Sequence, residues 1–296
     1  MKKVLLIGGS AIDYIATSDR PLEYKVSNSG KLDIAYGGVT RNVAHNLAKL
    51  GNKVTVITAL GKGELASSLK RHYKELGVNL IDAPTKYPTS TYVAINDSNH
   101  DMEVAIFDNR AVKDITPAFL KKIHKTINQH DFIFIDGNDS KEAIEYIAKK
   151  YSHKKIFCDP IAPEFIYKFL GVLDKIYLMK CNIYEARALV NQQKLQKEEL
   201  IKAIFNKGLK NVVVSNARND VYYGLDKKHI NHYKVTQFKK IANTTGCGDA
   251  LMSGIIDHLL LGKSFKDAIS FGNKLANLTL MSYHANSDQL TKFAHK

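Results

Sequence analysis

The sequence has no tryptophan, six prolines and three cysteines among its 296 residues. The cysteines, Cys158, Cys181 and Cys247, are odd in number and far apart, which predicts neither a disulfide framework nor a cysteine metal site. A few unpaired cysteines of this kind are typical of a protein of the reducing cytoplasm. No apolar run reaches the roughly 18 residues that a membrane-spanning helix needs, so we expect no membrane partner.

The common nucleotide-binding and hydrolase motifs are also missing. Gly262, Lys263 and Ser264 resemble the end of a P-loop, but Asp257 stands where its first glycine should be. No Gly-x-Gly-x-x-Gly follows the first apolar run, and the chain has no His-Glu-x-x-His and no Gly-x-Ser-x-Gly. Phosphate chemistry, if present, must use a different glycine turn.

The formal net charge is +14 at pH 7, which raises the hypothesis of a nucleic-acid partner. The lysines are dispersed, however, and no aromatic platform is interleaved with them. We therefore interpret them as a solvated surface and expect no polynucleotide partner. The positive field would still attract anionic nucleotides.

Strand-like and helix-like runs alternate along the chain. Short apolar runs predict strands at 4–7, 54–60, 132–135, 156–158, 176–179 and 212–215. Helical spacing predicts helices at 42–50, 65–76, 141–151, 183–190, 197–207, 250–261 and 265–281. This alternation predicts an α/β fold, a mostly parallel sheet with helices on both faces.

Two segments, about 14–36 and 88–110, break this rhythm with alternating strands around polar turns. They predict a small sheet that projects as a lid and excludes water from a ligand. The alternative is a pair of plain surface hairpins. We expect a single domain over residues 1–296 with this lid inserted.

The most informative turn is Gly246, Cys247 and Gly248, followed by Asp249 and an apolar helix. A helix N-terminus carries partial positive charge and unpaired N–H donors, which attract a phosphoryl group. A carboxylate beside a bound phosphate would repel it, so Asp249 suits a base that takes a proton from an attacking hydroxyl. The alternative is an ordinary capping Asp.

Two polar sites near the N-terminus suit a sugar. Asp13 follows the first strand, where a carboxylate can bind a diol, although it could equally form a turn. Gly37 and Gly38 allow close approach of backbone to a ligand, and Asn42 could bind hydroxyls. The alternative is that the two glycines only interrupt the secondary structure and that Asn42 only caps a helix.

Asn182 and Glu185 are spaced to share one helix face. An amide and a carboxylate suit a hydrated Mg²⁺, whereas the alternative is a capping box. The run at 212–215 leads into a polar turn that could face a nucleotide.

Taken in order, Gly37-Gly38-x-x-x-Asn42, Asn182-x-x-Glu185 and Gly246-Cys-Gly-Asp249 resemble the ribokinase-type (PfkB) carbohydrate and nucleoside kinases, from about residue 3 to residue 286. The resemblance implies a ribokinase-like three-layer sandwich with a small β lid. It also implies ATP and Mg²⁺ as cofactors and leaves a monovalent cation open. Lid-mediated homodimers are common among such kinases, and we consider the same arrangement here.

The resemblance implies that Asp249 is the general base and that the amides of Gly246, Cys247 and Gly248 form the anion hole. Mg²⁺ would be held by Glu185 and, through water, by Asn182. Substrate contacts would come from Asp13, Asn28, Gly37, Gly38, Asn42, Thr91 and Asn138. Nucleotide contacts would come from Asn182, Ser215, Asn216, Thr245, Gly248 and Asn273.

Several details are similar to the pseudouridine kinases of this family, among them Asp136-Gly-Asn138 and the run at 101–106. They favour phosphorylation of the 5′-hydroxyl of pseudouridine. The alternatives are a kinase for another sugar or nucleoside and, in a different class, a nucleic-acid-binding or regulatory protein on a retired kinase fold.

Three residues depart from the family pattern. Asn243 replaces the usual Asp, and the effect of this replacement on any ion-dependence of the reaction stays open. Cys247 replaces the usual Ala, and a thiol at a helix N-terminus is expected to have a lowered pKa and to react readily. The segment that begins at Ser215 lacks the glycine that usually contacts the nucleotide in this family.

Overall fold

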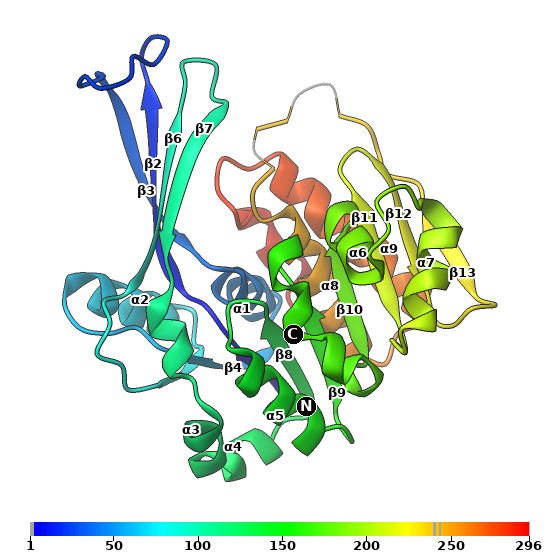
Figure 1. The fold of residues 1–296 in the computed structure, drawn as a ribbon. Helices are drawn as coiled ribbons and strands as arrows, with labels where there is room; N and C mark the ends of the chain where they lie inside the picture. The colour runs from blue at the N-terminus through cyan, green and yellow to red at the C-terminus, as the bar shows by residue number, and fades with distance from the viewer. Residues whose placement is uncertain (1–2, 239–240, 243, 296) are drawn as a thin grey trace.

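Two β-sheets organise the chain in the computed structural model, which describes residues 3–238, 241–242 and 244–295. The larger sheet has nine strands in the order β13-β12-β11-β10-β9-β8-β1-β4-β5. Its pairings are parallel from β11 to β5, and β12 and β13 add an antiparallel edge (Figure 1). The strands are β1 (Lys3–Ile7), β4 (Lys53–Thr58), β5 (Asn79–Asp82), β8 (Phe132–Asp136), β9 (Lys155–Asp159), β10 (Leu178–Asn182), β11 (Val212–Asn216), β12 (Asn219–Gly224) and β13 (Ile230–Tyr233).

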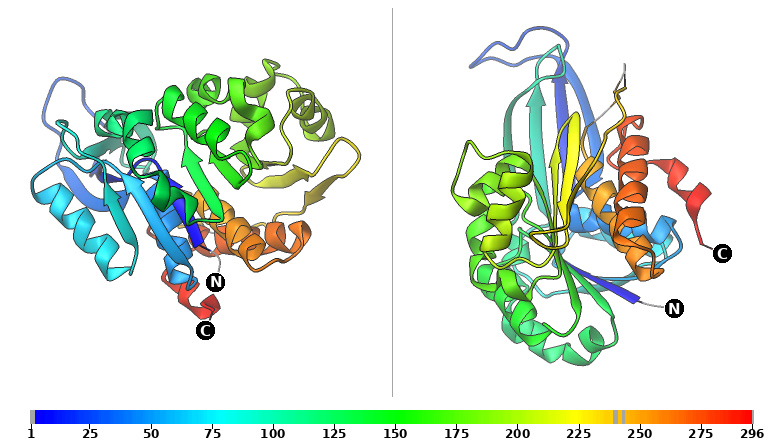
Figure 2. Two further views of the ribbon diagram at one scale, coloured as in Figure 1. Left: turned by 90° about the horizontal axis from the view of Figure 1, so that it is seen from below. Right: turned by 90° about the vertical axis from the view of Figure 1, so that its right-hand side faces the viewer.

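Helices cover both faces of this sheet, as the views from below and from the side show (Figure 2). One face carries α1 (Val39–Lys49), α2 (Glu64–Glu75), α8 (Cys247–Leu260) and α9 (Phe265–Leu280). The other carries α3 (Pro117–Lys122), α4 (His124–Asn128), α5 (Lys141–Lys150), α6 (Ile183–Val190) and α7 (Lys197–Asn206), with short 3-10 helices at η1 (Arg110–Asp114), η2 (Pro163–Lys168) and η3 (Leu170–Lys175). A fourth 3-10 helix, η4 (Asp288–Phe293), lies near the C-terminus.

Alternate residues of the central strands supply the two cores. Leu5 and Ile7 of β1 belong to the core under α5, α6 and α7, whereas Val4 and Leu6 belong to the core under α1 and α8. A strand that is buried on both faces must be apolar at every position, which explains the continuous apolar runs. The predicted α/β fold with a mostly parallel sheet is confirmed.

The element boundaries differ from expectation where polar residues interrupt the pattern. The strand expected at 176–179 instead covers Leu178–Asn182, because a buried lysine continues it beyond its apolar part. The helix expected from residue 250 begins at Cys247, because its first turn is built on glycine rather than on apolar residues. Strand β5 and helices α3 and α4 were not expected.

The smaller sheet has the order β3-β2-β6-β7 and projects from the body above α1 and α2 (Figure 1). Its strands are β2 (Ala11–Ser18), β3 (Gly30–Gly37), β6 (Ser90–Asn96) and β7 (Met102–Asp108). The parallel pairing of β2 with β6 joins the two segments that were expected to form a lid into one sheet. Its closure over a ligand stays a prediction.

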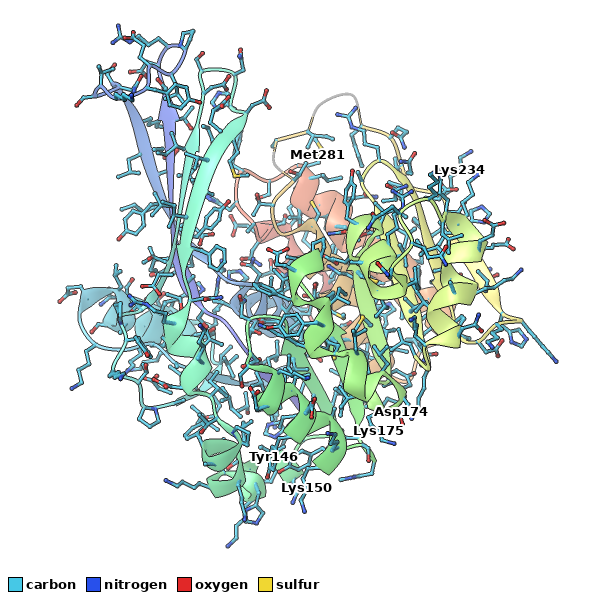
Figure 3. The ribbon with its side chains drawn as sticks, in the orientation of Figure 1. Tyr146, Lys150, Asp174, Lys175, Lys234 and Met281 are labelled. Atoms are coloured by element: carbon cyan, nitrogen blue, oxygen red, sulfur yellow. The ribbon has the colours of Figure 1, made fainter. Side chains whose placement is uncertain are left out.

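Lys150 and Lys175 lie near the lower end of the view in Figure 3, and Lys234 lies at its upper right. Lys175 is paired with Asp174 at 2.6 Å. The three lysines belong to different segments of the chain: Lys150 ends α5, Lys175 ends η3 and Lys234 follows β13. No helix in the described part of the chain is both long and apolar enough to cross a membrane.

Helices α8 and α9 approach each other through two glycines. A Cβ atom on Gly272 would lie 2.5 Å from the carbonyl oxygen of Leu251, and one on Gly254 would lie 2.6 Å from the Cα of Gly272. Because backbone atoms cannot move aside as side chains do, glycine is required at both positions.

We therefore expect Gly272→Ala to lower the free energy of unfolding by about 1–3 kcal/mol, the usual cost of overpacking a core. Urea unfolding measures it. Gly171→Ala is the matched control, since a Cβ there meets Glu145 Oε1 at 3.4 Å, an ordinary contact. Equal stability of the two variants would show that α8 and α9 are not in close contact at Gly272.

Candidate active site

Polar residues end four neighbouring parallel strands at one edge of the main sheet. The strand register sets Asp136 of β8 opposite Asp159 of β9, and Asn182 of β10 opposite Ser215 of β11. In open α/β sheets ligands bind outside the carboxyl ends of the strands. The candidate site is therefore this edge, together with the first turns of α1 and α8.

Asn42 in the first turn of α1 is bonded to Asp249 in the first turn of α8. The Nδ2 of Asn42 donates to Oδ2 of Asp249 at 2.7 Å. Its Oδ1 is buried and has no hydrogen-bond partner among the described residues. A buried acceptor without a donor is costly, so this atom is well suited to accept a hydrogen bond from a ligand hydroxyl.

The Asp249 carboxyl is buried, and its surroundings favour the protonated form. Burial and then the neighbouring Asp159 carboxylate raise its pKa to about 7, against the opposing effects of Lys180, the Asn42 hydrogen bond and Arg41. A carboxyl that titrates near neutral pH matches the requirement for a general base.

The glycine turn before Asp249 is held by close backbone contact. Gly246 has φ +81°, and a Cβ on it would lie 2.1 Å from the carbonyl oxygen of Ala285. The N-cap residue of α8 is Gly246 itself, which has no side chain to cap the helix. The first N–H groups of a helix lack helical partners, although the N–H of Cys247 also donates to the carbonyl oxygen of Thr244 at 3.5 Å. The role of the Gly246, Cys247 and Gly248 amides as an anion hole stays a prediction.

Asp13 lies at the base of the lid, directly against Gly37. A Cβ on Gly37 would lie 2.0 Å from Asp13 Oδ1, so only glycine leaves room for this carboxylate. Burial raises the pKa of Asp13 to about 6, and Arg41 partly opposes this rise. Gly38 has φ +93° and would place a Cβ 2.6 Å from the carbonyl oxygen of Gly9, so this turn also needs glycine.

Asp136 was not expected at the site, yet it connects three of its segments. Its Oδ2 accepts from the backbone N of Gly9 at 3.2 Å, and from the N and Oγ1 of Thr40 at 3.2 and 2.7 Å. Its Oδ1 accepts from the N of Asn138 at 2.8 Å. One buried carboxylate thus positions the loop before Asp13, the start of α1 and the loop after β8.

Arg41 and Asn286, neither of which was expected to contact a ligand, form a second connection. Arg41 Nη1 donates to Asn286 Oδ1 at 2.6 Å, and Arg41 Nη2 donates to the carbonyl oxygen of Tyr36. Asn286 Nδ2 donates to the carbonyl oxygen of Asn42 at 3.1 Å and to Asn46 Oδ1 at 2.7 Å. Since Ala285 contacts the turn at Gly246, these bonds tie α1 to the anion hole.

Asn182 and Glu185 form a complete capping box. Asn182 Oδ1 accepts from the N atoms of Tyr184 and Glu185, and Glu185 Oε2 accepts from Asn182 N at 2.7 Å. The structural alternative is therefore present, and it does not exclude a metal role. Burial and the nearby Asp159 carboxylate raise the pKa of Glu185 to about 7, so a cation here would relieve an excess of negative charge.

The donor set fits Mg²⁺ only in part. Among the described residues no cluster of three or more His, Cys, Asp and Glu could hold a metal. Mg²⁺ commonly keeps several waters and binds through one or two carboxylates plus substrate phosphates, which Glu185 and Asn182 could support from this edge.

The predicted nucleotide contacts do not all come together. Asn216 lines a cavity of about 360 Å³ between α7 and the β11–β12 hairpin, whereas Ser215 lies beside Asn182. Asn273 is buried in α9, where its Nδ2 donates to the carbonyl oxygen of Ile269 at 2.8 Å. Thr245 adjoins the glycine turn in the chain, and Asn243 lies outside the described residues.

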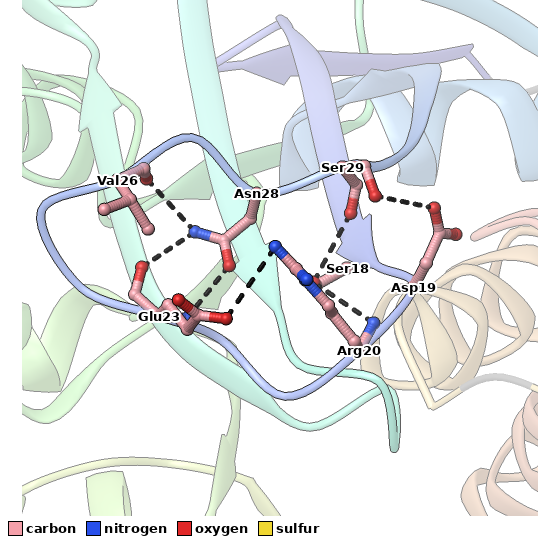
Figure 4. A network of polar contacts seen from close by, with 7 residues as sticks. All are labelled: Ser18, Asp19, Arg20, Glu23, Val26, Asn28 and Ser29. Atoms are coloured by element: carbon pink, nitrogen blue, oxygen red, sulfur yellow. Dashed lines mark hydrogen bonds and ion pairs between the residues drawn. The ribbon is translucent and has the colours of Figure 1, made fainter.

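The predicted substrate contacts are also divided. Thr91 pairs with Ile12 in the lid, and Asn138 lines a cavity of about 620 Å³ between β7 and η2. Asn28 instead lies in the loop at the lid tip (Figure 4). Its amide closes that loop by bonding Glu23 N and O and the carbonyl oxygen of Val26.

Residues 1–292 match the pfkB family of carbohydrate kinases. The chain belongs to this family. A pseudouridine kinase of Escherichia coli (strain K12) is 31% identical over 294 residues, covering 97% of this chain and 93% of the relative. A guanosine-inosine kinase of Exiguobacterium acetylicum is 24% identical over 289 residues, covering 93% of each. The predicted family is thus confirmed, and the protein is a sugar or nucleoside kinase of the pfkB family.

The structure of a ribokinase from Giardia lamblia superposes on this chain with a TM-score of 0.86 at 16% identity, covering 99% of both chains. This likeness confirms the expected ribokinase-like fold. At this identity it bears on the fold alone.

The expectation of a lowered pKa for the Cys247 thiol in this pfkB kinase is wrong. Burial, and then the Asp249 carboxylate, raise the pKa of the Cys247 thiol to about 12, which outweighs the position at a helix N-terminus. Cys158 and Cys181 are buried, and burial raises the pKa of both thiols well above the ordinary value.

We therefore expect iodoacetamide at pH 7.5 to modify the native kinase much more slowly than a free thiol, because little thiolate forms at any of the three cysteines. Mass spectrometry after timed quenching follows the reaction, and the urea-unfolded chain is the control. Rapid labelling confined to Cys247 in the native protein would contradict the raised pKa.

Proposed function

We propose that this kinase transfers the γ-phosphoryl group of ATP to the 5′-hydroxyl of pseudouridine. The observation that carries the proposal is the buried Asn42–Asp249 pair: a carboxyl with a pKa near neutrality, bonded to an amide whose other atom lacks a partner. This pair lies at the start of a helix, where an anion is favoured.

In the proposed step the acceptor hydroxyl loses its proton to the Asp249 carboxylate as its oxygen bonds to the γ-phosphorus. The bond from that phosphorus to the bridging oxygen breaks, and its electron pair remains on ADP. Asp13 and Asn42 orient the sugar, and the amides at residues 246–248 stabilise charge on the transferred group. Phosphoryl transfer depends chiefly on such positioning and charge stabilisation.

A divalent ion would supply positive charge to the β- and γ-phosphates. Glu185 would support it, with Asn182 acting through water. The Glu185 carboxyl, whose pKa is raised, would be held in its charged form by that ion.

The substrate assignment rests on the Escherichia coli relative and on the cavity beside the lid. Phe107, Phe165 and Tyr167 supply aromatic rings to this cavity, and Asn138 and Lys168 supply polar groups. A cavity of this size can enclose a nucleoside, since ligand sites commonly measure about 300–1,000 Å³. An aromatic wall with a few polar groups suits a nucleobase better than a bare sugar.

Two alternatives stay open. The guanosine-inosine kinase relative supports another nucleoside, and the ribokinase fold supports a sugar. A retired kinase fold is disfavoured, because Asp249, Asn42, Asn182 and Glu185 are all present and Asn42 contacts Asp249 directly. The three free cysteines suit a reducing compartment, which agrees with a cytoplasmic kinase.

The test is ATP consumption with pseudouridine, uridine, guanosine, adenosine, ribose and fructose phosphate as acceptors. We expect pseudouridine to react fastest and Asp249→Asn to lower kcat by at least about 10²-fold. Because the base must be deprotonated, kcat/KM should rise with pH through about 7 and then level off. A faster reaction with ribose would exclude the pseudouridine assignment, and an active Asp249→Asn variant would exclude the mechanism.

We also propose that the lid joins two copies of the chain. In the register of the lid, Tyr14 pairs with Ile34 and Val93, so these three side chains lie on one face of the sheet. Asp13 and the residues that it pairs with lie on the opposite face. The Tyr14 face packs against α2 at its base, and its outer part leaves these apolar side chains exposed: Leu32, Ile34, Val93, Ile95, Val104 and Ile106. A continuous apolar surface facing away from the substrate suits an isologous contact with a second lid.

We expect Ile34→Lys to yield a monomer in sedimentation velocity, because a lysine would be desolvated in that contact. Asp33→Lys is the matched control, with the same side chain introduced one residue earlier on the opposite face. A monomeric wild-type protein, or equal dissociation of both variants, would exclude this interface.

A further inference from the structure

Lys180 is a buried lysine beside the glycine turn, and none of the roles assigned so far uses it. Leu178 of β10 and Phe157 of β9 face the core under α8, and alternation places Lys180 and Asp159 on that same face. Both side chains are buried. Lys180 therefore occupies a position where the fold alone would call for an apolar side chain.

The ammonium group of Lys180 lies within the anion hole region. A Cβ on Gly248 would lie 2.7 Å from Lys180 Nζ, so the absence of a side chain on Gly248 leaves room for this ammonium. Asp159 Oδ2 holds Nζ from the other side at 2.6 Å. Within residues 3–238, 241–242 and 244–295, Asp159 is the one residue that forms an ion pair with Lys180. An ammonium has three N–H donors, so it can bind further acceptors.

Stability alone does not account for this ion pair. Removing two charges from water costs several kcal/mol for each ion, and replacing a buried pair by apolar residues is often neutral or stabilising. An apolar pair at positions 159 and 180 would continue the core of Phe157 and Leu178. The lysine therefore has a use beyond packing.

The charges around Lys180 indicate that use. Burial acts to lower its pKa, but the carboxylates of Asp159, Glu185 and Asp249 raise it above the ordinary value, so the ammonium stays charged. A permanent cation fixed beside the helix N-terminus is already in place when the phosphoryl group arrives. Such fixed charges stabilise a transition state because they need no reorganisation.

We propose that Lys180 is a catalytic residue whose ammonium, held in place by Asp159, contacts the γ-phosphoryl group during its transfer. This ammonium adds a full charge to the partial charges of the amides. Asp159 is then a positioning residue that acts through Lys180. This role rests on the proposed phosphoryl transfer at Asp249.

The test compares Lys180→Met, Asp159→Asn and the double variant, with the best acceptor of the wild-type enzyme. We expect Lys180→Met to lower kcat by about 10²–10³-fold, the usual cost of removing one transition-state donor, with KM for both substrates nearly unchanged. Binding of ADP should persist, whereas trapping of ADP with aluminium fluoride and acceptor should be lost.

Lys154→Met is the matched control. Lys154 lies before the opposite end of β9, where its Nζ donates to the carbonyl oxygens of Asn128 and His130. We expect this variant to lose stability without losing kcat or the trapped complex.

The double variant separates the two explanations. If Lys180 only neutralises Asp159, removing both charges restores kcat. If Lys180 contacts the phosphoryl group, the double variant stays as slow as Lys180→Met. Recovery of kcat to within about threefold of wild type, or an active Lys180→Met, would overturn the proposal. An active Asp249→Asn variant would instead refute the proposed function, so the two failures are distinguishable.

Discussion

The parallel register of β8, β9, β10 and β11 is the constraint on which the site depends. It sets Asp136 beside Asp159 and Asn182 beside Ser215, so that residues distant in the chain meet at one edge of the sheet. Burial of so many polar groups is unfavourable unless they bond to one another or to a ligand. The first turns of α1 and α8 complete this edge, because their unpaired N–H groups supply donors where the strands supply acceptors.

Glycine determines how closely these parts approach. Gly37 leaves room for the Asp13 carboxylate, Gly246 for the carbonyl oxygen of Ala285, and Gly248 for the Lys180 ammonium. In each case the glycine belongs to a recognisable motif, while the group that fills the space belongs to a distant segment. Each glycine motif and the group that fills the space beside it therefore form one physical unit, because a side chain on the glycine would displace that group.

This pairing explains what could be predicted from sequence. Helix and strand periodicity is local, so most elements and the glycine motifs were identified within a few residues of their observed ends. Asp136 and Asn286 act across the fold, on Thr40 and Arg41, and although the resemblance includes both residues, no local pattern indicates these distant contacts. Lysine is usually exposed, so the expected strand ended at residue 179, before Lys180. The pKa of Cys247 depends on burial, which a helix-terminus argument omits.

The electrostatics of the site run opposite to those of the whole chain. The chain carries a formal charge of +14, whereas among the described residues the carboxyl groups of Asp159, Glu185 and Asp249 lie around the Lys180 ammonium, with Arg41 as a further cation near Asp249. The outer field draws an anionic nucleotide toward the protein, but the local excess of carboxylates opposes its final approach. Burial, and then the Asp159 carboxylate, also raise the pKa of Asp249 into the range of a base. A site arranged in this way needs additional positive charge to bind its substrate, which a divalent ion and a fixed lysine supply by different routes.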